Sequence, residues 1–306
     1  MQQKIYWGLA RHCIVGLTMG FAALGAWAQT RTLTPVPAPV QASGATGDDL
    51  IWSVIHYPPT AILSGTQEGQ GFTDKARKLF MKSLPQYHHV VIEANYARLQ
   101  MELRSRPNVC SPAILRLPER EAFMLFSDPY LSAMPYLAIS LRGRDELGAF
   151  KTASGQLRLP DLLADGRFRV GVPGGRSLGS NYDKMLKAAP ANGSLVVRHG
   201  NPGVAGLLRM LLDRKVDLII GFPTELNYAA GEMGVTIDQL SLTAVAGGDD
   251  ATPLRVGCSK SETGERVIRR VNELIKSQRR EIEEYYLAWL PPELAAARRK
   301  AGGQGD

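Results

Sequence analysis

A glycine-rich turn at residues 174–177, reading Gly-Gly-Arg-Ser, is one segment whose residue types suit contact with an anion. It lies between a predicted strand, 169–172, and a predicted helix, 180–188. The first turn of a helix presents backbone N–H groups without partners and the positive end of the helix dipole. A plain strand-to-helix turn needs glycines as well, so both interpretations stay open. The candidate ligand contacts here are Gly175, Arg176 and Ser177.

Metal chemistry is not predicted from the cysteines and histidines. Cys110 and Cys258 are the two cysteines outside the N-terminal leader, too few for a thiolate cage, and the histidines show no HxxxH or related ligand spacing. We therefore expect no metal and no cofactor. In an oxidising compartment the two cysteines allow a disulfide without requiring one.

The N-terminus has the pattern of a secretory signal peptide. Lys4 and Arg11 precede the apolar run 13–24, and Ala26-Trp27-Ala28 forms a small-x-small cleavage site before Gln29. The run is shorter than the roughly 20 apolar residues that a retained membrane anchor needs. We predict a signal peptide over residues 1–28, cleaved after Ala28, and a mature protein free in the periplasm.

Composition and charge predict a disordered segment and argue against a nucleic-acid-binding protein. Residues 29–47 are rich in Pro, Ala, Thr, Ser and Gly and predict a disordered tether. The formal net charge is +7, two units of which belong to the leader. A nucleic-acid-binding protein concentrates such charge on one face. Here the densest basic runs, 276–280 and 298–300, are close to glutamates near the C-terminus, so we expect no nucleic-acid partner.

Strand and helix patterns alternate along the globular part of the chain. Apolar stretches predict strands at 50–55, 89–94, 109–115, 136–141, 169–172, 194–198, 216–220 and 254–258. Helical periodicity predicts helices at 74–84, 96–105, 180–188, 202–213, from 224, and at 262–289. Alternation of this kind predicts an α/β protein with parallel sheets covered by helices on both faces.

An ordered set of short motifs resembles the type II extracellular solute-binding proteins, the superfamily that includes polar amino-acid receptors of ABC importers (family 3). The strongest match is Pro118-Glu119-Arg120-Glu121 followed by Phe126-Ser127-Asp128-Pro129-Tyr130, where that family has a T-P-E-R-like turn before an F-S-x-P-Y crossover. The supporting matches are Tyr57-Pro58-Pro59, Gly71-Phe72-Thr73-Asp74, Val170-Gly171-Val172-Pro173-Gly174-Gly175 and Val216-Asp217-Leu218-Ile219-Ile220. Together they cover nearly the whole mature chain in the family's order.

The resemblance implies two α/β lobes with a ligand between them and a hinge of two crossing strands. Lobe 1 would comprise residues 48–130 and 258–295, and lobe 2 residues 131–257. The crossings would lie near 129–137 and 254–257, and residues 296–306 would form a flexible tail. We expect a monomer whose partners are a small-molecule ligand and an ABC importer permease or a membrane receptor.

The resemblance also assigns candidate ligand contacts. The arginine of the T-P-E-R-like turn holds the ligand carboxylate in amino-acid receptors of this family, a task that suits the planar fork of Arg120; a structural salt bridge is the alternative. Trp52 and Tyr57 are near the end of the first predicted strand. Either aromatic ring could stack on a ligand or fill the core. Ser111 is the hydroxyl in a stretch that is otherwise apolar where the receptors offer hydroxyls. Those receptors place an aspartate near position 221 for the ligand ammonium, and here Glu225 could serve instead.

The predicted function is periplasmic binding of a small polar solute, anionic or amino-acid-like, for an ABC-type importer, without catalysis. The alternative is an enzyme on the same fold, resembling a periplasmic cyclohexadienyl dehydratase, for which Glu225 and Glu93 are the candidate acids or bases. A ligand-sensing partner of a membrane receptor is a further alternative. No catalytic motif supports the enzyme, because the sequence has no nucleophile elbow or paired-carboxylate pattern.

Overall fold

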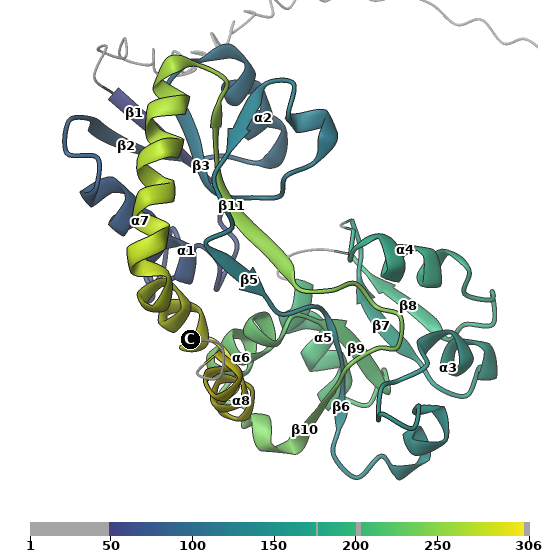
Figure 1. Ribbon diagram of the computed structural model, residues 1–306. Coiled ribbons are helices and arrows are strands. Elements are labelled where there is room, and N and C mark those ends of the chain that lie inside the picture. Colours follow the sequence, from purple (N-terminus) through teal and green to yellow (C-terminus); the bar gives the residue numbers. More distant parts are fainter. Residues whose placement is uncertain (1–48, 176, 200–202, 303–306) are drawn as a thin grey trace, which may run out of the picture. The chain divides into compact units, whose positions relative to one another are not determined.

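The computed structural model describes residues 49–175, 177–199 and 203–302 (Figure 1). The predicted signal peptide, the tether and Arg176 lie outside the described residues. Helices and strands alternate along the described chain and form two separate sheets. The α/β class is therefore confirmed.

The first sheet has six strands in the order β2-β1-β3-β11-β4, with β5 paired to β11. Their bounds are β1 Asp49–Val54, β2 His88–Glu93, β3 Val109–Ile114, β4 Met124–Phe126, β5 Leu131–Ala133 and β11 Thr252–Ser259. Strand β1 is parallel to β2 and β3, whereas β11 is antiparallel to β3, β4 and β5.

Alternating side chains of β1 enter two different cores of this sheet. Leu50, Trp52 and Val54 pack with helices α1 (Phe72–Lys82) and α7 (Glu262–Leu287) on one face. Ile51 points to the other face, where helix α2 (Tyr96–Ser105) contributes Leu99 and Leu103. Because successive side chains of a strand point to opposite faces, β1 makes apolar contacts on both faces of the sheet.

The second sheet has five strands in the order β10-β6-β9-β7-β8. Their bounds are β6 Leu137–Leu141, β7 Val170–Pro173, β8 Leu195–Arg198, β9 Leu218–Gly221 and β10 Leu240–Thr243. Its helices are α3 Leu159–Asp165, α4 Ser180–Lys187, α5 Gly203–Leu212 and α6 Pro223–Glu232, with the 3-10 helix η2 Asp145–Phe150. Helices α3 and α4 and η2 contribute to the core on one face, α5 and α6 to the core on the other.

Two paired segments connect the sheets. After Tyr130 the chain forms β5, which runs antiparallel to the start of β11, with Leu131 opposite Leu254 (Figure 1). Beyond β5 the chain enters the second sheet as β6. The chain therefore passes between the sheets twice, at the positions that the F-S-x-P-Y motif and the late strand predict. This is the hinge of two crossing strands expected of the type II fold.

Cys110 and Cys258 form a disulfide that joins β3 to β11, with their Cα atoms 4.0 Å apart. The two residues are directly opposite each other in the antiparallel pairing of these strands. The bond ties together positions 148 residues apart, and so connects the late strand of the chain to the early part of the first sheet.

The structure corrects two expectations from the sequence and adds four elements that were not predicted. Both sheets are mixed rather than parallel, because β11, β6 and β10 pair antiparallel with their neighbours. Strands β4, β5 and β10 and helix α3 were not predicted. The flexible tail is wrong for residues 296–302, since helix α8 (Pro292–Gly302) occupies them. Arg298 donates to Glu283 and to the Ser132 carbonyl, and Arg299 pairs with Glu284, which attaches α8 to the first sheet and α7.

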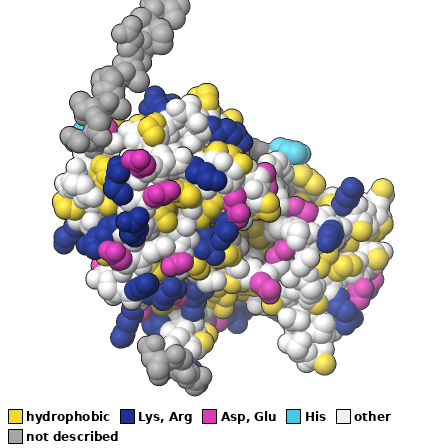
Figure 2. All heavy atoms as spheres, turned by 45° about the horizontal axis from the view of Figure 1, so that its top comes forward, with side chains coloured by type: hydrophobic (Ala, Val, Ile, Leu, Met, Phe, Trp, Pro, Cys, Tyr) yellow, Lys and Arg dark blue, Asp and Glu magenta, His cyan; other side chains and the backbone are white. Residues whose placement is uncertain are grey.

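Surface charge is mixed rather than gathered. On the face shown in Figure 2, Lys and Arg side chains are interspersed with Asp and Glu side chains. Among the described helices none is both long and apolar enough to cross a bilayer. The described residues likewise contain no group of three or more side chains placed to ligate a metal ion.

Candidate ligand-binding site

A small pocket of about 70 Å³ lies at the carboxyl end of β1. It is lined by Val54, Ile55, Tyr57, Thr60, Ala61, Thr73, Tyr96, Ser111, Pro112 and Ala113. The loop after β1 is fixed by a reciprocal pair of backbone hydrogen bonds, Tyr57 N to Ala61 O at 2.9 Å and Ala61 N to Tyr57 O at 3.0 Å. Ligands of open α/β sheets bind outside the carboxyl ends of the strands, so the position of this pocket suits a binding site.

Tyr57 connects this pocket to the second sheet. Its hydroxyl donates a hydrogen bond to Oε1 of Glu225. Glu225 is in the first turn of α6, where the helix dipole favours a carboxylate, and it is only 7 % exposed. Two of the predicted contacts, from segments 168 residues apart, are thus brought together.

A stacked pair of aromatic rings lies within electrostatic range of this carboxylate. Tyr136 and Phe222 stack with their ring centroids 3.7 Å apart and an interplanar angle of 24°. Burial, and to a smaller extent the charge of Glu225, raise the pKa of Tyr136. Tyr96 also acts electrostatically on Tyr136 and lines the small pocket. A buried carboxylate beside aromatic faces suits a cationic group, because both attract positive charge.

The aromatic neighbours were missed in the sequence. Tyr136 begins one predicted strand and Phe222 follows another. These positions are the only indication in the sequence that the two rings lie at the same edge of one sheet. Tyr96 begins a predicted helix, and nothing in the sequence indicates that it lies near Tyr136.

Arg120 takes a different position from Tyr57 and Glu225. It ends the 3-10 helix η1 (Pro118–Arg120), and its Nη1 donates to the Leu115 carbonyl at 2.8 Å. It does not line the small pocket. Glu121, one of its potential salt-bridge partners, pairs with Arg116 at 2.6 Å instead. The anion-binding role of Arg120 stays a prediction.

The N-terminus of α4, which follows the glycine-rich turn, already holds a carboxylate of the chain itself. Asp249 accepts hydrogen bonds from the backbone N–H groups of Asn181 at 3.0 Å and Tyr182 at 3.2 Å, and from the Ser180 hydroxyl at 3.2 Å. Ser177 is occupied locally, donating to Asp183.

Gly175 contributes backbone geometry to the same turn. Its φ of 78° is in the left-handed region that favours glycine, so the plain-turn interpretation explains this residue fully.

Trp52 and Ser111 separate into core and pocket. Trp52 is fully buried, stacks on Phe80 and donates its indole N–H to His89 Nδ1 at 3.0 Å. The structure therefore places it in the core, the alternative considered for it, and not in the pocket lining. Ser111 does line the pocket. Glu93, at the end of β2, is exposed.

Solved structures that superpose on this chain include amino-acid solute-binding proteins. An ancestral cationic amino-acid solute-binding protein superposes with a TM-score of 0.59 at 16% identity, covering 80% of this chain and 96% of its own. An ancestral arginine-binding protein bound to arginine gives 0.53 at 16% identity, covering 80% and 99%. The periplasmic VFT2 domain of BvgS from Bordetella pertussis gives 0.54 at 15% identity, covering 79% and 93%.

The chain has the type II periplasmic binding-protein fold. At these identities the likeness shows the fold alone. No family model matches the sequence, and no curated protein matches it. What this type II chain binds must be argued from its own residues.

Proposed function

We propose that this chain binds a small amino-acid-like solute bearing a cationic group and presents it to the permease of an ABC importer. The observation that supports the proposal is the Tyr57 to Glu225 hydrogen bond, which joins the loop after β1 to the first turn of α6. A ligand ammonium or guanidinium would take the place of the Tyr57 hydroxyl at Glu225, or share the carboxylate with it. Solved structures of the same fold include an amino-acid ABC transporter substrate-binding protein from Streptococcus pneumoniae bound to L-arginine.

Calorimetric titration of the mature chain with L-arginine, L-lysine, L-glutamine and L-glutamate tests the proposal. We expect L-arginine or L-lysine to bind and L-glutamate to bind more weakly, because Glu225 repels a second carboxylate. Replacing Glu225 by Gln keeps the side-chain shape and removes the charge. It should weaken binding of the cationic solute by about 30-fold or more, since removing one partner of a buried charge pair costs about 2 to 5 kcal/mol.

Glu232→Gln is the matched control, because Glu232 is exposed at the end of the same helix. It should leave the affinity unchanged. Equal affinities for E225Q and the unaltered chain, with both folded, would remove Glu225 from the site.

Arg120 remains the proposed partner of the solute carboxylate. In this role its guanidinium would leave the Leu115 carbonyl and make charge-assisted bonds to the ligand. Arg120→Ala should then lower affinity by a similar factor while leaving the thermal melt in place. An unchanged affinity would reject the role, and a collapsed melt would make Arg120 structural.

Two alternative functions are each supported by one similar solved structure. One solved structure of the same fold is an ancestral amino-acid-binding protein that is a precursor of cyclohexadienyl dehydratase, at 14% identity and a TM-score of 0.53. This likeness supports the enzyme alternative, with buried Glu225 as acid or base. Turnover of prephenate or arogenate would support it. The BvgS domain likewise keeps a membrane receptor as the alternative partner.

Export is part of the proposal. Cleavage after Ala28 would give a mature periplasmic chain starting at Gln29, and N-terminal sequencing of protein recovered from the periplasm checks it. Elution as a monomer in gel filtration is the expected state.

A further inference from the structure

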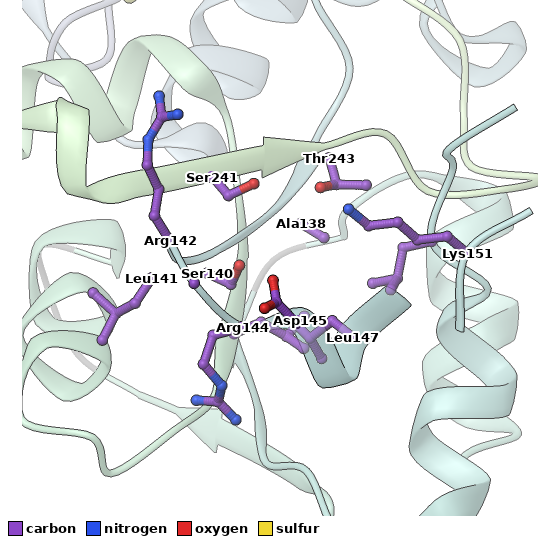
Figure 3. Close-up of a pocket in the computed structure, with 13 residues that line it drawn as sticks. Ala138, Ser140, Leu141, Arg142, Arg144, Asp145, Leu147, Lys151, Ser241 and Thr243 are labelled. Carbon is purple, nitrogen blue, oxygen red and sulfur yellow. The ribbon is translucent and has the colours of Figure 1, made fainter. Parts of the chain in front are cut away.

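A second cavity, of about 310 Å³, lies on the second sheet and is lined by neither Tyr57 nor Glu225. Figure 3 shows it between the strand pair β6–β10 and the 3-10 helix η2. In the pairing of these strands Ser140 is opposite Ser241, and Ala138 is opposite Thr243. One face of the strand pair therefore presents hydroxyl groups. The other face carries apolar residues of the α5–α6 core, Ile139, Leu141, Leu240 and Leu242.

The hydroxyl groups of the cavity have no partner inside the described part of the chain. Ser140 is only 8 % exposed, yet its Oγ bonds to no described residue, and the same holds for the hydroxyls of Ser241 and Thr243. These hydroxyl groups face the cavity, so they are available to exchange hydrogen bonds with a polar occupant.

The cavity is also bordered by one cation and one anion, the exposed residues Lys151 and Asp145, which are not paired with each other. In Figure 3 the Lys151 ammonium and the Asp145 carboxylate point into the space beside Thr243 and Ser140. Within the described ranges neither side chain forms an ion pair. The Lys151 backbone is held in place, because Arg158 Nη1 donates to its carbonyl at 2.6 Å.

The two arginines of the lining do not change this balance. Figure 3 shows the guanidinium groups of Arg142 and Arg144 directed away from the hydroxyl cluster. Arg144 is engaged by Asp217 at 2.9 Å and by Glu146. Arg142 is 3.7 Å from Glu293. Lys151 is thus the cation that faces the interior of the cavity.

We propose that this cavity is a second binding site, for a small carboxylate that also carries hydroxyl or ammonium groups. Lys151 holds the carboxylate, and Asp145 with the three hydroxyls accepts hydrogen bonds from the donor groups of the ligand. The volume matches the lower end of small-molecule sites, about 300 Å³ and above. The site is independent of the proposed solute site.

Methyl-resolved NMR titration of the mature chain tests the proposal with three probes. L-Serine supplies the ammonium form of the ligand and D-gluconate the hydroxylated form, whereas D-glucitol has hydroxyls without a carboxylate. We expect saturable shifts at the methyl groups of Ala138, Leu147 and Thr243 with at least one carboxylate probe and none with D-glucitol. Which carboxylate saturates identifies the ligand class.

Lys151→Met should weaken that binding at least about tenfold, as expected for the loss of a charge-assisted contact. Lys187→Met is the matched control, since Lys187 is exposed on α4 and does not line the cavity, and it should change nothing. Thr243→Val, which keeps the shape and removes one hydroxyl, should weaken binding by a smaller factor. Thermal melts verify that each variant is folded.

Three results would overturn the proposal. One is the absence of saturable shifts up to about 20 mM of either carboxylate, well above a millimolar Kd. Another is equal affinity in Lys151→Met, Thr243→Val and the unaltered chain. The third is a set of shifts confined to Ala61 and Ala113, which would place the probes at the small pocket by β1 instead.

Discussion

The two sheets are stabilised in different ways. The first sheet is assembled from the two ends of the described chain: its core joins α1 to α7, and β11 lies between β3 and β4. It contains the disulfide and a buried ion pair, Asp74 with Arg77. The second sheet is built from the continuous segment 137–243 and is packed between two apolar clusters.

This difference follows from chain connectivity. Bringing distant segments together costs more loop-closure entropy than closing short loops. A covalent bond that closes a long loop removes most freedom from the unfolded chain. The first sheet, whose strands are furthest apart in sequence, is therefore where single ties should matter most, and the second sheet should respond weakly to the loss of any one polar contact.

Removing the disulfide should have the largest effect. In the chain-entropy account, a bond closing a loop of 148 residues stabilises the fold by about 4 to 5 kcal/mol. The double variant Cys110→Ala, Cys258→Ala should lower the free energy of unfolding in urea by about that amount. Hydrogen exchange should show lost protection in β3 and β11 before β7 and β9. Equal loss in both sheets would break the comparison.

The buried ion pair of α1 should come next. Asp74 is fully buried and also accepts the Ile62 N–H at 2.7 Å, and Arg77 Nη2 lies 3.1 Å from it. Arg77→Met leaves this carboxylate without its cation, which should cost about 3 kcal/mol or more. Lys82→Met, an exposed change in the last turn of the same helix, is the control and should cost far less.

The cost of Arg77→Met should depend on pH. Burial raises the pKa of Asp74 above the ordinary value of an aspartate, so the charged form destabilises the fold as the pH rises through the folded pKa. Without Arg77 the folded pKa rises further, because its charge lowers it. The destabilisation should therefore be larger at neutral pH than below the unfolded pKa. A pH-independent cost would show that packing, and not charge, determines the effect.

Much of this architecture was predictable because long elements carry strong periodic signals. Helix α7 and strands β1 and β3 are where the apolar spacing puts them, and the F-S-x-P-Y motif directly precedes the crossing that it predicts, at β5. Strands β4 and β5, of three residues each, are too short for a two-residue period to be visible. Helix α8 was missed because its charged residues indicate solvent exposure, whereas Arg298 and Arg299 bind glutamates of α7.

The site was predictable only where a motif or a strand end marked it. Tyr57 and Glu225 follow strands, and the structure brings them into contact. Asp249 could not be found, since it caps a helix from 68 positions away along the chain and no local pattern links the two. Its carboxylate explains why the helix N-terminus after the glycine-rich turn is already filled.

Removing Asp249 should have a moderate effect, confined to the second sheet. Loss of a helix-capping acceptor costs about 1 kcal/mol, so Asp249→Ala should lower the free energy of unfolding by about that amount. Exchange of the Asn181 and Tyr182 amides should accelerate. Asp250→Ala, an exposed neighbouring change, should leave both measurements unchanged; matching effects of the two variants would reject the capping role.

The smallest effect should come from Arg144, the ion-pair counterpart of Arg77 in the second sheet. Arg144 pairs with Asp217 at 2.9 Å, but the two side chains are 24 % and 20 % exposed, against 7 % and 0 % for Arg77 and Asp74. Solvent screens such a pair, so Arg144→Met should cost no more than about 1 kcal/mol.

Salt separates the two pairs. Near 1 M the Debye length falls to about 3 Å, and exposed charges are then largely screened while buried pairs are screened much less. The cost of Arg144→Met should therefore shrink in about 1 M NaCl, and the cost of Arg77→Met should persist. Parallel urea titrations of both variants at low and high salt give the measurement. If salt reduces the cost in unfolding free energy equally for both variants, the Asp74–Arg77 pair is not shielded from solvent as its burial predicts. The contrast between the two sheets then depends on the disulfide alone.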